Sequence, residues 1–445
     1  MSTPSATVAG GVIELREWRQ CFLPDRHLSS SARILADELR TAEGGRLIVD
    51  DLHDGLRITT RAWVGVVRLD DLEIRVVPKL AGKDHDALID MIEFTRGLET
   101  LARTRTGVRS LDASGAGLFD LIALLFSEEA ERIIDGGLVA DYLEHEDALP
   151  LVRGRLLIER QLRRSFGRYE RVHCRFDERS TDIRHNQVLG AAAAVCARYA
   201  RDPRVRSKAQ IILGVLQEAC DWSHLDRDQL VEPFPYDRLT AHYRTAHELA
   251  RLILGNTNVR DLLAAGRTRS FAFLINMNLL FERFVGAVLR RLLREKAVVH
   301  EQRRDRSIIW DADAGRRYAT IIPDIVIEPV DPTRRRVAVD AKYKLYDERN
   351  ADVGDVMQTF LYAYAYSTES VRPRSAILYP AGDVPVEPRR LQVRSTAGVV
   401  GAEIDLIPLP VDRLIAEMKG EQGMALAELG GRLEDLVESD AVAQV

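Results

Sequence analysis

The hydrophobic pattern changes its period twice along the chain, and this change limits the possible folds more than any other feature of the sequence. In the first hundred residues, short apolar runs separated by turn residues such as Asp54-Gly55 predict strands. From about residue 85 to residue 265, apolar residues recur at spacings of three and four, which predicts helices. The final third mixes both patterns. We therefore predict an α+β multidomain protein.

Four regions follow from these patterns, because 445 residues exceed the roughly 250–300 that one hydrophobic core supports. We expect a β-rich N-terminal domain (1–110), a mostly helical middle region (111–265), a mixed sheet flanked by helices (266–400) and an acidic helical tail (401–445). The predicted strands are 12–18, 46–50, 56–60, 62–69, 72–78, 298–302, 307–310, 318–328, 336–344, 374–379 and 391–396. The predicted helices are 30–43, 85–97, 117–135, 186–200, 205–221, 238–255, 271–296 and 352–367.

Charge is distributed unevenly. The net charge is −5, which argues against a strongly basic nucleic-acid-binding protein, but residues 151–175 carry eight Arg against two Glu. This basic segment, which we expect to include a strand or two, indicates either a local polyanion contact or a solvated arginine face. The longest apolar run, 188–197, is shorter than the ~20 residues that span a bilayer, and the first residues lack a signal-peptide pattern. We expect a cytoplasmic protein.

Acidic residues interrupt two apolar strands of the final third. In IIPDIVIE (321–328), Pro323 and Asp324 break the apolar run, and in VAVDAKYK (337–344) the run passes directly into Asp340. A buried carboxylate is destabilising unless it is paired or bound to a metal ion. Two of them on neighbouring strands predict a shared cation.

Strand alternation extends this prediction. It places Asp340 and Lys342 on one face, about 6.6–6.8 Å apart, and turns Ala341 to the other face. If Asp324 faces the same side as Asp340, the two carboxylates and the Ala341 carbonyl form a site for Mg²⁺, which prefers oxygen ligands and retains water. One such water would be the nucleophile. The simpler interpretation is a structural strand end with an incidental ion pair.

The acid-x-Lys tripeptide is weak on its own, because Glu417-Met418-Lys419 is a second match in a predicted helix. The presence of lysine, not arginine, at position 342 supports a functional role for the first match. The chain has 56 Arg and only seven Lys, yet Lys342 and Lys344 lie two positions apart. Lysine supplies a compact charge and a proton that it can release, which arginine does not.

Two predicted helices offer supporting groups. Glu282 lies in a helix that is otherwise apolar on its core side and could be a third carboxylate at the ion. Asp355, Gln358 and Tyr362 share one helical face that could lie beside the strand ends. A solvent-exposed Glu and an amphipathic surface stripe explain these positions about as well.

Together these residues resemble the PD-(D/E)xK nuclease superfamily, and within it the McrC family, the nuclease subunits of McrBC 5-methylcytosine-specific restriction systems. The resemblance rests on MNLLFERFV (277–285), IIPDIVIE, VAVDAKYKLY (337–346) and DVMQTFLYAYA (355–365). It extends to WVGVVRLDDLEIRVVPKL (63–80), LVRGRLLI (151–158) and FDERSTDIRHNQVL (176–189), in family order.

The resemblance implies a Mg²⁺-dependent DNA endonuclease that cleaves double-stranded DNA containing modified cytosine together with an AAA+ GTPase motor, an McrB-like subunit. It implies metal binding by Asp324 and Asp340, water activation or charge stabilisation by Lys342, and a first acidic position at Glu282. Gln358 and Tyr362 match the helix after the site. The N-terminal domain would dock on the motor and stimulate it, and this chain has no Walker-type phosphate-binding motif of its own.

Two alternatives differ in class. The chain could act chiefly as a motor-activating adaptor with secondary or lost nuclease activity, as its β-rich N-terminus and weak overall basicity permit. It could also be a stand-alone structure-specific nuclease, which would cleave without a partner.

Overall fold

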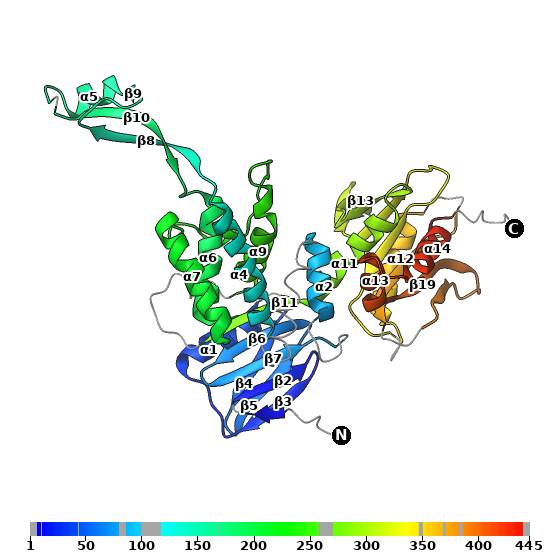
Figure 1. Cartoon of the computed structure of the whole chain (residues 1–445). Helices are drawn as coiled ribbons and strands as arrows, with labels where there is room; N and C mark the ends of the chain where they lie inside the picture. The colour runs from blue at the N-terminus through cyan, green and yellow to red at the C-terminus, as the bar shows by residue number, and fades with distance from the viewer. Residues whose placement is uncertain are drawn as a thin grey trace.

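The computed structural model describes most of the chain, and Figure 1 shows its arrangement. The described residues are 7–9, 11–42, 44–79, 86–98, 117–168, 170–257, 270–346, 350–367, 371–381 and 386–438. The predicted boundaries near residues 110 and 265 and the last seven residues of the predicted tail lie outside these ranges. Within these ranges no helix has the length and apolar character needed to span a membrane.

Two sheets form the N-terminal part of the molecule (Figure 1). Their strand orders are β1-β2-β7-β6-β11 and β3-β5-β4, and helix α1 packs into the apolar core that the two sheets share. Ser29 caps α1 by accepting a hydrogen bond from the amide of Ala32. The bounds are β1 (Thr7–Ala9), β2 (Val12–Arg16), β3 (Gln20–Pro24), α1 (Ser30–Thr41), β4 (Leu47–Leu52), β5 (Gly55–Thr60), β6 (Trp63–Leu69) and β7 (Leu72–Val77). The β-rich prediction for this region is confirmed, although β1 and β3 were not predicted.

Strand β11 (Phe271–Asn276) shows that the predicted helix over 271–296 was wrong in its first turns. Residues 271–275 are all buried, and a short continuous apolar run does not distinguish a buried strand from a helix. β11 pairs with β6, where Gly65 is required because a Cβ there would lie 2.1 Å from the carbonyl oxygen of Phe273. Helix α11 (Met277–Leu292) begins only after Asn276, whose side chain caps it. The N-terminal sheet is therefore completed by a strand from the final third of the chain.

Helices dominate the middle region and stand over the N-terminal sheet (Figure 1). They are α2 (Asp86–Arg96), α4 (Leu118–Gly136), α6 (Arg184–Tyr199), α7 (Pro203–Ala219), α8 (Arg227–Val231), the short 3₁₀ helix η2 (Ala241–Tyr243) and α9 (Arg244–Asn256). From these helices a ribbon projects away from the body of the molecule. It consists of β8 (Asp141–Leu149), β9 (Arg155–Leu156), α5 (Ile158–Arg164) and β10 (Val172–Ser180). The prediction that the arginine-rich segment includes strands is confirmed.

A six-stranded sheet organises the C-terminal part, with strand order β12-β15-β16-β17-β19-β18. Strands β16, β17 and β19 are parallel, and the outer pairings are antiparallel. The bounds are β12 (Ala297–Glu301), β13 (Asp305–Asp311), β14 (Arg316–Ile321), β15 (Ile325–Pro329), β16 (Val337–Ala341), α12 (Val353–Ala365), β17 (Arg374–Ala381), β18 (Arg389–Arg394), β19 (Val400–Pro410), α13 (Val411–Met418) and α14 (Ala425–Val437).

Two predictions for this part were wrong. The predicted strand 318–328 is two strands, because Pro323 separates β14, which pairs only with β13, from β15 in the main sheet. The predicted helical tail begins with a strand, β19, which lies between β17 and β18 inside the sheet. Its residues 402–409 are continuously buried, so the acidic composition of the whole tail concealed an apolar core strand. Only α13 and α14 match the helical prediction.

Candidate active site

Strand β16 alternates its side chains between two apolar layers. Val339 and Ala341 face the layer that contains α11, α13 and α14, whereas Ala338 packs with Tyr362 of α12. Because successive side chains of a strand point to opposite faces, Asp340 faces α12. This orientation agrees with the prediction that Ala341 turns away from Asp340.

Antiparallel pairing brings the two predicted aspartates together. The register pairs Ile325 with Val339, so Asp324, one position before Ile325, lies opposite Asp340. The two carboxyl groups interact electrostatically, and the charge of Asp324 raises the pKa of Asp340 in addition to burial. Oδ2 of Asp324 also accepts a hydrogen bond of 2.9 Å from the amide of Ala341, which fixes this carboxyl group at the strand end.

Burial is the main reason why the pKa values of both aspartates are raised. Burial, followed by the charge of Asp324, raises the pKa of Asp340 to about 7, although Lys342 opposes this shift. Burial also raises the pKa of Asp324. Asp340 is completely buried, and within the described ranges neither of its carboxylate oxygens accepts a well-formed hydrogen bond. Oδ1 of Asp340 is therefore available as an oxygen ligand for a cation, whereas Oδ2 lies beside the ammonium of Lys342.

Lys342 lies on the same face. Its Nζ is 2.9 Å from Oδ2 of Asp340 and donates a hydrogen bond of 3.2 Å to Oε1 of Gln358 in α12. Burial lowers the pKa of Lys342, but the charges of Asp340 and Asp324 outweigh burial and raise it overall. The lysine is therefore a cation held between the buried carboxylates and the solvent-facing side of the site.

Helix α12 packs against the face of the sheet to which Asp340 and Lys342 point, and it contributes further side chains to the site. The side-chain amide of Gln358 donates a hydrogen bond of 2.8 Å to the hydroxyl of Tyr362, which donates one of 3.2 Å to the carbonyl of Ile322. Asp355 lies one turn earlier in α12, and its Oδ2 is 2.5 Å from Nζ of Lys344. The structure thus brings Gln358 and Tyr362 to the aspartates and lysine, whereas Asp355 holds the neighbouring lysine.

Glu282 occupies an outer position. It accepts a hydrogen bond from the side-chain amide of Gln302, whose backbone amide donates one of 2.9 Å to the carbonyl of Asp324. Burial raises the pKa of Glu282, and the nearby charge of Asp340 adds to the shift. In the part of the chain that is described, no three His, Cys, Asp or Glu side chains lie close enough to share a metal ion. Glu282 therefore reaches the aspartates through Gln302.

The donor set fits a Mg²⁺ ion that two carboxylates hold. Asp340 offers oxygens without well-formed hydrogen bonds, and Asp324 lies opposite it. Both are hard oxygen ligands, and a Mg²⁺ site with one or two carboxylates completes its coordination with water or substrate oxygens. The charge of the cation would also stabilise the ionised forms of the two carboxyl groups, which burial disfavours.

Sequence reasoning missed two contributors. Gln302 connects Glu282 to Asp324 from a position just after β12, where its φ of 49° lies in the left-handed region. No pattern in the sequence identifies it, because its role depends on a turn. Tyr346 was also missed, although it donates a hydrogen bond to Asp355 and lies two residues after Lys344 in the loop that follows β16. No strand alternation could identify it, because β16 ends at Ala341.

The fold and the site define a mixed α+β protein with a buried carboxylate pair and a lysine at one end of a six-stranded sheet. A family model described as "McrBC 5-methylcytosine restriction system component" matches residues 58–380, which is well over half of the chain. The chain belongs to this family. The family resemblance predicted from the sequence motifs is confirmed.

One solved structure shares the fold of this chain over most of its length. A chain from the half-complex of a tetradecameric assembly of Thermococcus gammatolerans McrB AAA+ hexamers with bound McrC is similar over 96% of this chain and 100% of that chain, with a TM-score of 0.60 and 18% identity. A chain from the cryo-EM structure of the T. gammatolerans McrBC complex covers 63% of this chain and 88% of that chain, with a TM-score of 0.47 and 20% identity. No curated protein sequence matches.

Proposed function

We propose that this chain is the DNA-cleaving subunit of a modification-dependent restriction system, with a PD-(D/E)xK active site built from Asp324, Asp340 and Lys342. One observation carries the proposal. The register of β15 and β16 sets the two carboxylates opposite each other, and the lysine lies within 2.9 Å of one of them. Family membership supports it, since the family is that of 5-methylcytosine restriction system components.

The side chains have separate roles in this proposal. Asp324 and Asp340 would hold Mg²⁺, which supplies Lewis-acid stabilisation of the phosphate and lowers the pKa of bound water. Lys342 places a positive charge beside the scissile phosphate and stabilises the negative charge that develops there. Gln358 orients Lys342 through its Oε1, and Tyr362 fixes Gln358. Glu282 and Gln302 keep the Asp324 end of the site in place.

The partner in this proposal is an AAA+ GTPase motor of the McrB type. The solved assembly with similar fold is described as McrB AAA+ hexamers with bound McrC. The modified cytosine would be read by the motor, and this chain would cut the double-stranded DNA that the motor delivers.

The experiment uses the full chain with its cognate motor, GTP and Mg²⁺ on methylated and unmethylated plasmid DNA. The proposal predicts cleavage of methylated DNA only, and only with the motor and Mg²⁺ present. Cleavage without the motor would favour a stand-alone nuclease. Absence of cleavage with the motor present would contradict the nuclease proposal.

A second role, activation of the motor, is favoured by the projecting ribbon that spans residues 141–180. This ribbon exposes large apolar side chains, among them Leu151 (77% exposed), Ile158 and Phe166 (80% exposed), beside its arginines. Exposed apolar groups of this size mark contacts with other proteins. The ribbon is thus a candidate motor contact in addition to the predicted N-terminal domain.

A further inference from the structure

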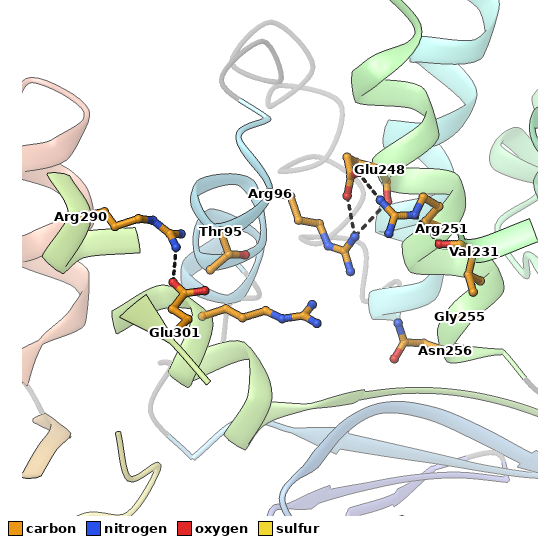
Figure 2. A pocket seen from close by; sticks show the side chains of 10 residues that line it. Thr95, Arg96, Val231, Glu248, Arg251, Gly255, Asn256, Arg290 and Glu301 are labelled. Atoms are coloured by element: carbon orange, nitrogen blue, oxygen red, sulfur yellow. Dashed lines mark hydrogen bonds and ion pairs between the residues drawn. The ribbon is translucent and has the colours of Figure 1, made fainter. Parts of the chain in front are cut away.

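A cavity of about 560 Å³ lies between helices α2, α9 and α11, outside the site described above. Figure 2 shows the side chains that line it. Six of its lining residues are charged: Arg96, Arg251, Arg283, Arg290, Glu248 and Glu301.

The charges of this cavity are not balanced. Arg96 and Arg251 share one carboxylate, that of Glu248, at 2.9 and 2.5 Å (Figure 2). Arg290 pairs with Glu301, and Arg283 forms no ion pair with any described residue. Among the lining residues, four guanidinium groups against two carboxylates leave two positive charges in excess, and Arg283 also interacts with the charge of Glu282 just outside the lining. The charges of Arg283 and Arg251 disfavour the protonated form of Arg96, so the arginines repel one another.

Two charged residues of the cavity interact with Glu282 of the candidate active site: besides burial, which is the main cause of its raised pKa, the charge of Glu301 raises the pKa of Glu282 and that of Arg283 lowers it. Arg283 follows Glu282 in α11, and Glu301 precedes Gln302, which donates a hydrogen bond to Glu282. An anion in the cavity would therefore lie next to the Glu282 side of the site.

We infer that this cavity binds backbone phosphates of the DNA strand that enters the candidate active site. Arginine presents paired donors that fit phosphate oxygens, and a partly enclosed site with excess positive charge concentrates phosphate groups. The inference rests on the proposed function, because it assigns the ligand as DNA and not as a free phosphate or nucleotide.

Arg283 is the residue to change first, because its removal leaves no described carboxylate unpaired. The test measures fluorescence anisotropy of a labelled duplex with the full-length chain in Ca²⁺, so that binding is read without cleavage. R283A and R251Q are compared with R394A, which removes an exposed arginine on β18 that contacts only Gln392 among the described residues. Competition with inorganic phosphate and with GTP forms separate arms.

We expect R283A to weaken DNA binding about 3- to 10-fold at moderate salt and to reduce the slope of log K against log salt by about 1, while R394A changes neither. Wild-type affinity and slope in both R283A and R251Q would overturn the inference, as would tight displacement of DNA by GTP or free phosphate. Since binding is measured in Ca²⁺, a chain that binds DNA through this cavity but never cleaves would contradict the proposed function and leave this inference standing.

A second inference comes from a separate contact, between the N-terminal part and Tyr343, the residue after Lys342. Tyr343 faces away from the site, and its hydroxyl donates a hydrogen bond of 2.8 Å to Oε2 of Glu17. Lys79 donates its ammonium to the carbonyl of Tyr343 at 2.7 Å and lies 4.1 Å from the centre of its ring. Both partners lie just after strands of the N-terminal sheets, Glu17 after β2 and Lys79 after β7, 264 or more residues away in sequence.

We infer that Tyr343 is a positioning residue that transmits the N-terminal part's placement to Lys342. The segment that follows β16 is held from both sides: Lys342 and Lys344 contact α12 on one side, and Tyr343 contacts Glu17 and Lys79 on the other. A shift of the N-terminal part would thus move the peptide that carries the lysine. This inference also rests on the proposed function.

The test compares Y343F, E17A and E17Q with the matched control Y318F, which alters an exposed tyrosine. Single-turnover cleavage is measured with the motor, and the environment of Lys342 is read by NMR after reductive ¹³C-methylation of the seven lysines, with K342R for assignment. We expect Y343F and E17A to slow cleavage about 10-fold and to shift the Lys342 signal, and E17Q, which still accepts the hydrogen bond, to be near wild type. An unchanged Lys342 signal in Y343F and E17A would overturn the inference even if the wild type did not cleave DNA.

Discussion

The ammonium of Lys342 lies 2.9 Å from the carboxylate of Asp340, and the lysine side chain is one-fifth exposed while Asp340 is fully buried. The pair therefore joins a buried anion to a cation at the mouth of the site. A buried carboxylate without a counter-charge is strongly unfavourable in its ionised form. Loss of Lys342 removes a charge that both Asp340 and an incoming phosphate require.

The first prediction concerns Lys342. K342A should reduce the single-turnover cleavage rate by at least about 100-fold, because the developing phosphate charge loses its lysine. DNA affinity in Ca²⁺ should change much less. The matched control is K419A, which removes the lysine of the second acid-x-Lys tripeptide. Equal losses in both variants would argue against a specific role of Lys342.

The second prediction concerns the metal. Mg²⁺ should raise the melting temperature of the chain in the absence of DNA, since an ion that binds only the folded state stabilises it by about 2.7 kcal/mol at 100 times its dissociation constant. D324N and D340N should abolish this Mg²⁺-dependent shift, and D37N, which alters an exposed aspartate on α1, serves as the control. A full shift in D340N would place the metal elsewhere.

The third prediction concerns pH. Burial, which outweighs the hydrogen bond from the amide of Lys79, raises the pKa of Glu17 from its usual 4.5 to about 7. The folded state thus binds the Glu17 proton more tightly than the unfolded chain, so this group stabilises the fold less as pH rises from about 4.5 to 7 and has no further effect above that. E17Q should equal the wild type near pH 4.5 and be more stable at pH 8, by up to about 3 kcal/mol.

Chemical denaturation of E17Q and wild type across pH 4.5–8 checks this prediction. The quantity to compare is the difference between the two proteins, because other groups also titrate in this range. A difference that stays constant with pH would show that Glu17 has an ordinary pKa in the folded protein.

Much of the candidate site could be predicted because its signal is local. Charged residues directly after apolar runs identify Asp324, Asp340 and Lys342, and period-two alternation places the last two on one face. The pairing of β15 with β16 could also be predicted, because strands that follow each other in sequence are usually neighbours in a sheet. Gln302 and Tyr343 could not be found in this way, since their partners lie across turns or in another sheet.

The errors in the fold have the same origin. Strand β11 is apolar except for its last residue, Asn276, and only its pairing with β6, some two hundred residues earlier, makes it a strand. β19 likewise depends on its place between β17 and β18. The conformation of a short apolar run depends on the strands or helices that pack against it, and the local sequence pattern carries no information about these partners.

The fourth prediction concerns the projecting ribbon of residues 141–180. F166D and L151D should weaken binding to the motor and reduce stimulation of its GTP hydrolysis, because a buried charge would replace an apolar contact. The full chain is the right material, since a fragment of residues 1–110 would lack strand β11 of its own sheet. I34D, which alters another exposed apolar residue, on α1, is the matched control. Unchanged motor binding in both ribbon variants would exclude the ribbon as a contact.

If Asp324 and Asp340 form one metal-dependent centre for phosphodiester hydrolysis, D340N should lose this activity. The measurement is the single-turnover rate of methylated-DNA cleavage by D340N, assembled with the motor and GTP in saturating Mg²⁺. We expect a loss of cleavage of at least about 100-fold with motor binding and GTP hydrolysis intact. Cleavage by D340N at the wild-type rate would show that Asp340 is not part of the hydrolytic centre.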